Sequence, residues 1–368
     1  MNNFAEPTTK KAPFVRIIKR SELSNRNRLW LQALSLAFAL IAGGLFILFI
    51  GHNPLQIYST MITGSFRNQM AIQATVRFTV PLLITTLGVT LAFKMQFWNI
   101  GAEGQVIMGA IFASYFALFH SNWPHLLLIA VMFVAGLVGG GLWGLIPCIF
   151  KVKFGTNETL FTLMLNYIAL YLISLLRDGA WADPSSPGFP KIARFAANAQ
   201  LDKVFGINIG WIVALLLVVI LFVYMKFSKH GYEISVVGES TATAKYAGMN
   251  VKKIMLRTMF LSGGIAGVAG MIQSTGSDMT LATGVAGGVG FTAIIVAWLA
   301  QLNPIAILFV SSLFGIMEKG SSIVESTYKL SANFSDILQG IILFFVLGTD
   351  FFIRYKIAFR KSQKGGNN

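Results

Sequence analysis

The sequence predicts an all-α polytopic membrane protein with about ten transmembrane helices. Over 368 residues, 55% are hydrophobic and only 12% are charged, with a mean hydropathy of +0.68. That composition leaves too little polar surface for a soluble globule. The net charge of +15 comes from Lys and Arg in short segments between apolar runs, where they set membrane orientation rather than bind nucleic acid.

The first expected span is the uncharged run Leu29–Ile50, which follows a basic cytoplasmic tail at residues 1–28. Ten spans make residues 29–353 one transmembrane domain, and residues 354–368 a second cytoplasmic tail. Most of the 29 Lys and Arg residues then fall on the cytoplasmic side, as the positive-inside rule requires. The other nine spans are Ala71–Phe93, Trp98–Phe119, His125–Phe150, Asn157–Leu176, Ile209–Phe227, Ile254–Thr275, Gly284–Ala300, Pro304–Val324 and Ser335–Ile353.

The stretch Asn99–Gln105, N-I-G-A-E-G-Q, places a carboxylate and two amides inside an apolar region. A charged group in hydrocarbon costs about 3 kcal/mol or more, so Glu103 is a candidate functional residue. Gly101 and Gly104 would let the chain leave regular helix there, which predicts a broken or re-entrant helix. The alternative is that Glu103 marks the cytoplasmic end of a span, close to Lys94.

Two loops are long enough to have structure of their own. The turn-rich segment 177–208 is expected outside the cell, where it could cap a pore or meet an external partner. In the cytoplasmic loop 228–253, Ser240 can cap a short helix over Thr241–Ala247, and Gly248 is placed to end it. This helix is either a docking element for a soluble subunit or an ordinary amphipathic loop helix.

Glycines recur at helical spacing in two spans. Gly136, Gly140 and Gly144 form one ridge, and Gly263 with Gly267 forms another, so both predict close helix packing. The glycine-rich run Gly284–Gly290 follows no strand and is interpreted as a flexible or kinked span entrance rather than a nucleotide cradle.

The sequence offers no self-contained catalytic chemistry. It has no G-x-x-x-x-G-K-[ST] phosphate loop, so this chain is not expected to hydrolyse ATP. The lone Cys148 lies in an apolar run and is expected to be an inert buried thiol. The four histidines lack metal-ligand spacing, and no metal site is predicted: His52, His120, His125 and His230.

Three motifs together carry a family resemblance. The stretch F-W-N-I-G-A-E-G-Q begins at Phe97, and about fifty residues later come G-T-N-E from Gly155 and T-L-M-L-N-Y from Thr162. In this order they resemble the permease subunits of bacterial ATP-binding-cassette (ABC) importers for nucleosides and simple sugars, with the nucleoside branch most similar. The resemblance extends from about Ala71 to Asp350.

The cytoplasmic loop is similar to the family pattern V-G-x-N-P-x-A-A-x-Y-A-G-I, which contacts the ATPase. Val237-Gly238 and Tyr246–Met249 match, whereas Ser240, Thr241 and Thr243 depart from it. The resemblance implies a coupling loop in which Tyr246 anchors the ATPase and Ala244 and Ala247 permit close approach. The predicted coupling residues are Gly238, Ser240, Ala244, Tyr246, Ala247 and Gly248.

A second similarity is the segment G-F-x-A-I from Gly290, although Trp298 and Ala300 stand where the family usually has Leu and Gly. A nucleoside is polar and has a flat apolar face, so its pathway needs amide hydrogen-bonding groups and an aromatic surface. A pentose would suit the same side chains. The predicted pathway residues are Asn99, Glu103, Gln105, Asn157, Glu158, Asn166 and Phe291.

The resemblance implies a transport subunit of the bacterial plasma membrane that forms half of a nucleoside pathway. Its implied partners are an ABC ATPase that holds ATP and Mg, a second permease, expected to be a different chain, and an extracytoplasmic substrate-binding lipoprotein. No cofactor on this chain is expected. Three alternatives stay open: an importer for a simple sugar, an ion-coupled secondary transporter, since an intramembrane acid and a broken helix also suit carriers, and a structural membrane scaffold.

Overall fold

The computed structural model describes residues 15–19, 25–186, 188–331 and 333–359, which form two compact units. The smaller unit combines the described residues up to Leu55 with those from Asp336 onward. In it, strand β1 (Val15–Lys19) pairs antiparallel with β4 (Tyr355–Phe359). Phe38 of α1 (Asn25–Phe49) stacks on Phe345 of α13 (Phe334–Arg354). The rest of the two predicted tails lies outside the described residues.

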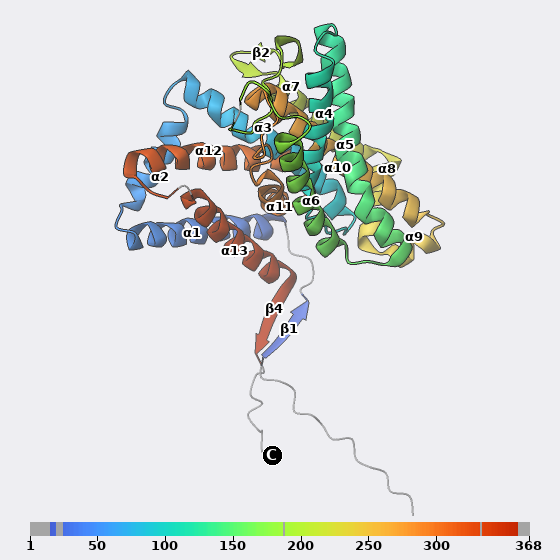
Figure 1. Ribbon diagram of the computed structural model, residues 1–368. Coiled ribbons are helices and arrows are strands. Elements are labelled where there is room, and N and C mark those ends of the chain that lie inside the picture. The colour runs from blue at the N-terminus through green and yellow to red at the C-terminus, as the bar shows by residue number, and fades with distance from the viewer. Residues whose placement is uncertain (1–14, 20–24, 187, 332, 360–368) are drawn as a thin grey trace, which may run out of the picture. The chain divides into compact units, whose positions relative to one another are not determined.

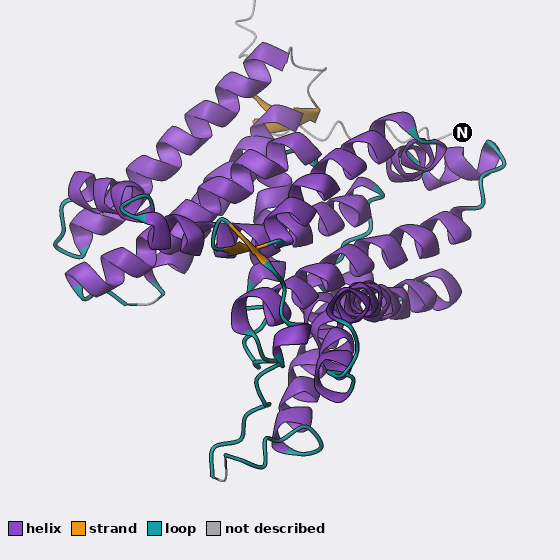
Figure 2. Ribbon diagram, turned by 90° about the horizontal axis from the view of Figure 1, so that it is seen from above, coloured by secondary structure: helices purple, strands orange, loops and turns teal. Residues whose placement is uncertain are grey.

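The larger unit, Gln56–Ser335, is almost entirely helical (Figures 1 and 2). Its two short strands, β2 (Lys203–Val204) and β3 (Ile207–Asn208), form a hairpin in the loop before α7. A 3₁₀ turn, η1 (Ala197–Ala199), precedes them. The helices are α2 (Pro54–Ser65), α3 (Gln69–Lys94), α4 (Ala102–Phe119), α5 (His125–Phe154), α6 (Glu158–Asp178), α7 (Gly210–Phe227), α8 (Lys229–Glu239), α9 (Thr241–Tyr246), α10 (Val251–Ile272) with the π-helical η2 (Gln273–Asp278), α11 (Val289–Leu299) and α12 (Pro304–Tyr328).

Seven helices of the described chain are long and apolar enough to cross a membrane, or eight if α1 and α2 count as one span. The seven match expected spans and confirm a polytopic membrane protein, while the count of ten and the side of the termini stay predictions. The expected span Gly284–Ala300 begins with a non-helical entrance over residues 284–288, as the glycine-rich run predicted. Only α11 is helical there, and its 11 residues reach about 16 Å, half of a bilayer core. The sequence analysis also did not predict α2 or α8.

The core of the larger unit is formed by α3, α4, α5 and α10, which pack side by side (Figure 1). The two glycine ridges meet each other there: Gly140 of α5 lies against the Gly263 carbonyl of α10, and Gly267 lies against the Gly136 carbonyl. A Cβ on Gly140, Gly263 or Gly267 would collide with backbone of the facing helix, and one on Gly136 would collide with the Met271 Cβ. The packing role predicted for both ridges is therefore confirmed, and the lone Cys148 is buried as expected.

Two cavities mark the opposite ends of this unit. One of about 390 Å³ is lined by the end of α3, the α5–α6 turn and the α8–α9 corner, including Glu158 and Met255. The other, of about 590 Å³, includes Arg177 and Asp278. Glu158 and Arg177 lie in the first and last turns of α6, so the cavities lie at opposite ends of that helix. The loops predicted to be cytoplasmic and extracytoplasmic are thus separated as the sequence indicated.

Candidate functional site

The helical spans break between α3 and α4. After Lys94 the chain leaves the helix, passes through Gln96 at φ 60°, and resumes helix at Ala102. Asn99 and Gln105 bridge the break with two amide hydrogen bonds, each 3.1 Å long, and the Asn99 Oδ1 also accepts from the Gly101 amide. Both side chains are fully buried. Their amides therefore satisfy polar groups of an irregular segment inside the helical bundle.

Helix α6 supplies the second support for this break. Asn166 accepts from the Gly104 amide at 2.8 Å and donates to the Ile100 carbonyl at 2.9 Å, while the Thr162 hydroxyl accepts from the Ile100 amide. A Cβ on Gly104 would lie 3.0 Å from the Asn166 Oδ1. Gly104 lies inside α4, so the expectation that it interrupts the helix is wrong. It allows α6 to approach closely.

A second break separates α10 from α11. The π-helical η2 ends the α10 span, and the segment 279–288 continues without helix, with positive φ at Met279, Gly287 and Gly288. A π-helical turn often marks a functional position in a helix. The loop of residues 177–208 covers the start of this segment. The Phe195 amide donates to the Met279 carbonyl, and the Thr280 hydroxyl donates to the Ile192 carbonyl.

Glu103 joins the two breaks. Its two carboxylate oxygens accept from the backbone amides of Gly288 and Gly290, at 2.8 and 2.7 Å. Helix α11 has no capping side chain of its own, so the carboxylate of α4 caps its N-terminus, where the helix dipole favours a negative charge. A Cβ on Gly290 would lie 2.6 Å from the Glu103 Cα, so only glycine permits this approach.

These contacts argue against Glu103 as a mere boundary residue beside Lys94. No ion pair joins the two side chains among the residues the structure describes. Gly288 and Gly290 were not predicted from the sequence as partners of the carboxylate. The available signal was a glycine-rich run followed by an apolar helix that lacks a Ser, Thr, Asp or Asn cap.

Of the other predicted pathway residues, Asn157 and Glu158 lie at the start of α6, whereas Phe291 follows Gly290, which bonds to this carboxylate. Glu158 pairs with Lys151 at 2.7 Å and fastens the α5–α6 turn. Asn157 caps α6 through the Leu160 amide and lines an apolar groove of about 460 Å³ along that helix. Phe291, next to Gly290, is 44% exposed.

Three aromatic rings pack together beside the first break, at the ends of α3 and α11. Trp98 lies 5.6 Å from Phe93 and 5.7 Å from Trp298, measured between ring centroids, and Trp298 lies 5.8 Å from Phe93. The Trp at position 298, unusual for the family motif, thereby packs the end of α11 against the end of α3.

The coupling segment has the predicted shape. Ser240 accepts from the Thr243 amide, α9 covers Thr241–Tyr246, and Gly248 ends it at φ 75°. Tyr246 is 99% exposed and Ala247 is also exposed, whereas Ala244 is fully buried. The expectation that Ala244 permits approach of a partner is therefore wrong, because it packs inside this chain.

Two irregular segments that meet at a partly buried carboxylate, within a bundle of apolar helices, are typical of a multi-pass membrane transport protein. Residues 71–347 match the family described as the branched-chain amino acid transport system permease component, and the chain belongs to that family. It is a permease subunit of an ABC importer in the cell membrane, a transport subunit rather than a catalytic one.

Three relatives are similar over most of the chain. The guanosine ABC transporter permease NupP of Bacillus subtilis is 29% identical, covering 93% of this chain and 99% of that protein. The nucleoside ABC transporter permease NupB of Lactococcus lactis subsp. cremoris is 30% identical, covering 81% and 85%. The glucose ABC transporter permease TsgB13 of Haloferax volcanii is 28% identical, covering 91% of each.

Proposed function

We propose that this permease imports nucleosides and supplies half of their translocation pathway. The observation that carries the proposal is the Glu103 cap, which holds two irregular segments together where α4, α6 and α11 meet. Irregular backbone at membrane depth is tolerated only where it is buried in protein or lines a wet cavity. The two nucleoside relatives favour a nucleoside, and the glucose relative keeps a simple sugar as the alternative.

In this proposal the pathway follows the exposed side of α6 and α11, past Asn157 and Phe291. The amides of Asn99, Gln105 and Asn166 hold the break rigid in the state described, and they become available to a substrate only if the break opens. The cavity of about 590 Å³ beside Arg194 and Asp278 would be the external entrance. Glu158, paired with Lys151, would lie at the inner exit.

The proposed partners follow from what the chain presents. Helix α9 offers Tyr246 and Ala247 to a separate ATPase that binds ATP and Mg, as the resemblance implies. A second permease would face the apolar side of α6, where Met164, Tyr171 and Leu175 are exposed. A substrate-binding lipoprotein would dock over the external entrance.

The first experiment measures uptake of labelled guanosine by the chain assembled with its ATPase, second permease and lipoprotein. We expect saturable uptake that unlabelled nucleosides inhibit, that ribose and leucine do not, and that persists when proton and sodium gradients are collapsed. Inhibition by ribose alone would assign a sugar. Accumulation driven by an ion gradient without ATP would assign a secondary carrier.

The second experiment tests docking through Ala247→Arg. The residue is exposed and outside the spans, so the fold should be unharmed while bulk and an unpaired charge block the ATPase. We expect loss of ATPase co-purification together with loss of uptake. A variant that still binds its ATPase and transports normally would show that α9 is not the coupling element.

A further inference from the structure

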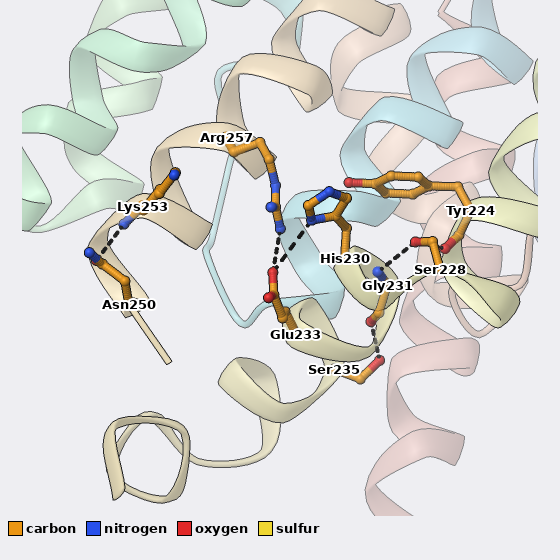
Figure 3. Close-up of polar contacts among 9 residues, drawn as sticks. All are labelled: Tyr224, Ser228, His230, Gly231, Glu233, Ser235, Asn250, Lys253 and Arg257. Atoms are coloured by element: carbon orange, nitrogen blue, oxygen red, sulfur yellow. Dashed lines mark hydrogen bonds and ion pairs between the residues drawn. The ribbon is translucent and has the colours of Figure 1, made fainter. Parts of the chain in front are cut away.

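The helix that leads into the coupling segment is bound to the core by an ion pair. Helix α8 ends at Glu239, and α9 begins at Thr241. On α8, the Glu233 Oε2 accepts a hydrogen bond of 2.8 Å from the Arg257 Nη2 of α10. Figure 3 shows Glu233 between Arg257 and the ring of His230, whose Nδ1 is 3.5 Å from the same oxygen.

The pair is partly withdrawn from solvent. The Glu233 side chain is 15% exposed and that of Arg257 is 27% exposed. The hydrogen bond from Arg257 holds the pKa of the Glu233 carboxyl below its usual value of 4.5, so the pair is ionised at neutral pH. Removing Arg257 would leave the Glu233 carboxylate with only the longer His230 contact, and removing Glu233 would leave the Arg257 charge partly buried without its carboxylate; both are more disruptive than losing an exposed pair.

The other attachments of α8 act differently. At its start, the Ser228 hydroxyl accepts from the Gly231 amide and donates to the Tyr224 carbonyl, which makes a tight corner with α7 (Figure 3). Near its end, Gly238 lies against the Lys94 carbonyl of α3. That van der Waals contact resists compression and hardly resists separation. Among the described ion pairs, only Glu233–Arg257 joins α8 to α10, and it resists separation.

Helix α10 leads from this pair to the transport site. It packs against α3, α4 and α5, with Gly270 against the Val106 carbonyl of α4. It continues as η2 to Asp278, at the external cavity and the start of the second break. Because close-packed helices transmit strain, a displacement of Arg257 along α10 reaches both broken spans.

We propose that the Glu233–Arg257 ion pair transmits movement of α8 and α9 to α10, in the pulling as well as the pushing direction. The proposal rests on the proposed docking of an ATPase at α9. Both residues are positioning residues, since the pair lies at the inner end of α10 and acts on the pathway through that helix. An ATPase that opens and closes requires such a link, because a purely repulsive contact between α8 and the core could push α10 but could not pull it back.

The test uses the assembled transporter with Glu233→Gln or Arg257→Gln, measuring uptake, ATP hydrolysis and ATPase co-purification on the same preparations. We expect co-purification to be retained and the substrate moved per ATP to fall about tenfold, as for loss of one member of a partly buried pair. The double variant should be no worse than either single variant, because both remove the same interaction.

Two further variants control for charge and folding. Lys253→Gln removes an exposed cation one turn earlier on α10, and Lys253 has no ion pair in the described part of the chain. This variant should leave the substrate moved per ATP unchanged. Arg257→Lys keeps the charge and loses the planar fork, so it should give an intermediate ratio. If the Gln variants aggregate in size-exclusion chromatography, the substrate moved per ATP by Arg257→Lys is compared with that of the unaltered chain instead.

The outcomes separate this inference from the proposed function. Unchanged substrate per ATP in both Gln variants would overturn the transmission role. Loss of ATPase co-purification in Glu233→Gln would assign the pair to docking and would also overturn it. Failure of the unaltered chain to bind its ATPase would instead refute the proposed coupling loop.

Discussion

Replacement of Glu103 by Gln tests the contact that joins the two broken spans. The carboxylate offers one oxygen to the Gly288 amide and the other to the Gly290 amide. A Gln side chain keeps one acceptor and turns its NH₂ group toward the second amide. One hydrogen bond is therefore lost, and the remaining one is no longer charge-assisted.

The expected loss can be worked from these two bonds. A hydrogen bond to a charged group contributes about 1.5–3 kcal/mol and a neutral one about 1 kcal/mol, so the gross loss is about 2–5 kcal/mol. A neutral side chain also avoids part of the desolvation penalty of a carboxylate, which offsets about 1–2 kcal/mol. Taking the middle of each range, the net destabilisation of the α11 start is about 2 kcal/mol, or roughly 30-fold in its opening equilibrium.

Two measurements check this estimate. Hydrogen exchange of the Gly288 and Gly290 amides should accelerate by about 10- to 100-fold, following the opening equilibrium. Uptake should fall severely, while membrane insertion stays normal because removing a charge eases insertion. Glu325→Gln is the matched control, since it makes the same change on α12 away from both breaks. Unchanged exchange at both glycines with near-normal uptake would refute the capping role.

Three other predictions follow from the same structure. Gly290→Ala should abolish uptake and lower the thermal stability of the purified chain, because the added Cβ would collide with the Glu103 backbone; normal melting and uptake would contradict that packing. Gly101→Leu should reduce the folded yield, since the added Cβ would lie 3.0 Å from the Thr162 Cβ. A variant as monodisperse as the unaltered chain in size-exclusion chromatography would contradict this prediction. Because the folded pKa of Glu233 is lowered, the stability from its ion pair is complete above pH 4.5 and is lost as the pH falls through the lower folded value. The melting temperature should therefore fall more steeply on acidification in the unaltered chain than in Glu233→Gln. Parallel curves of melting temperature against pH would contradict the pairing.

Local signals predicted the parts of the fold that depend on local chemistry. Ser240 and Gly248 define α9 because a capping hydroxyl and a left-handed residue act within a few positions. The ridges of α5 and α10 were evident from glycine spacing, although their contact with each other was not. The run Gly284–Ala300 was apolar throughout, so hydropathy could not distinguish a short half-helix with an extended entrance from a continuous span.

The candidate site was predicted only in part, because its decisive contact is distant in sequence. The motif at Asn99–Gln105 identified the carboxylate and the break, yet nothing near Glu103 indicates an acceptor role toward Gly288 and Gly290. Asn99 and Gln105 were chosen as amide groups for a substrate, and the structure shows that they bond to each other. The residue types suggested hydrogen-bonding groups for a substrate, but burial and mutual hydrogen bonds leave these two amides unavailable to one in this state.

The Glu103 cap also bears on the synthesis of the chain. Gly288 follows Glu103 by 185 residues, which a ribosome needs roughly 10–40 s to add. During that interval α4 has emerged while the amides that hydrogen-bond to its carboxylate do not yet exist. The nascent chain must keep Glu103 in water, protonated, or in contact with the insertion machinery until α11 arrives. Completion of the second half is therefore the event that allows the first half to settle in the lipid.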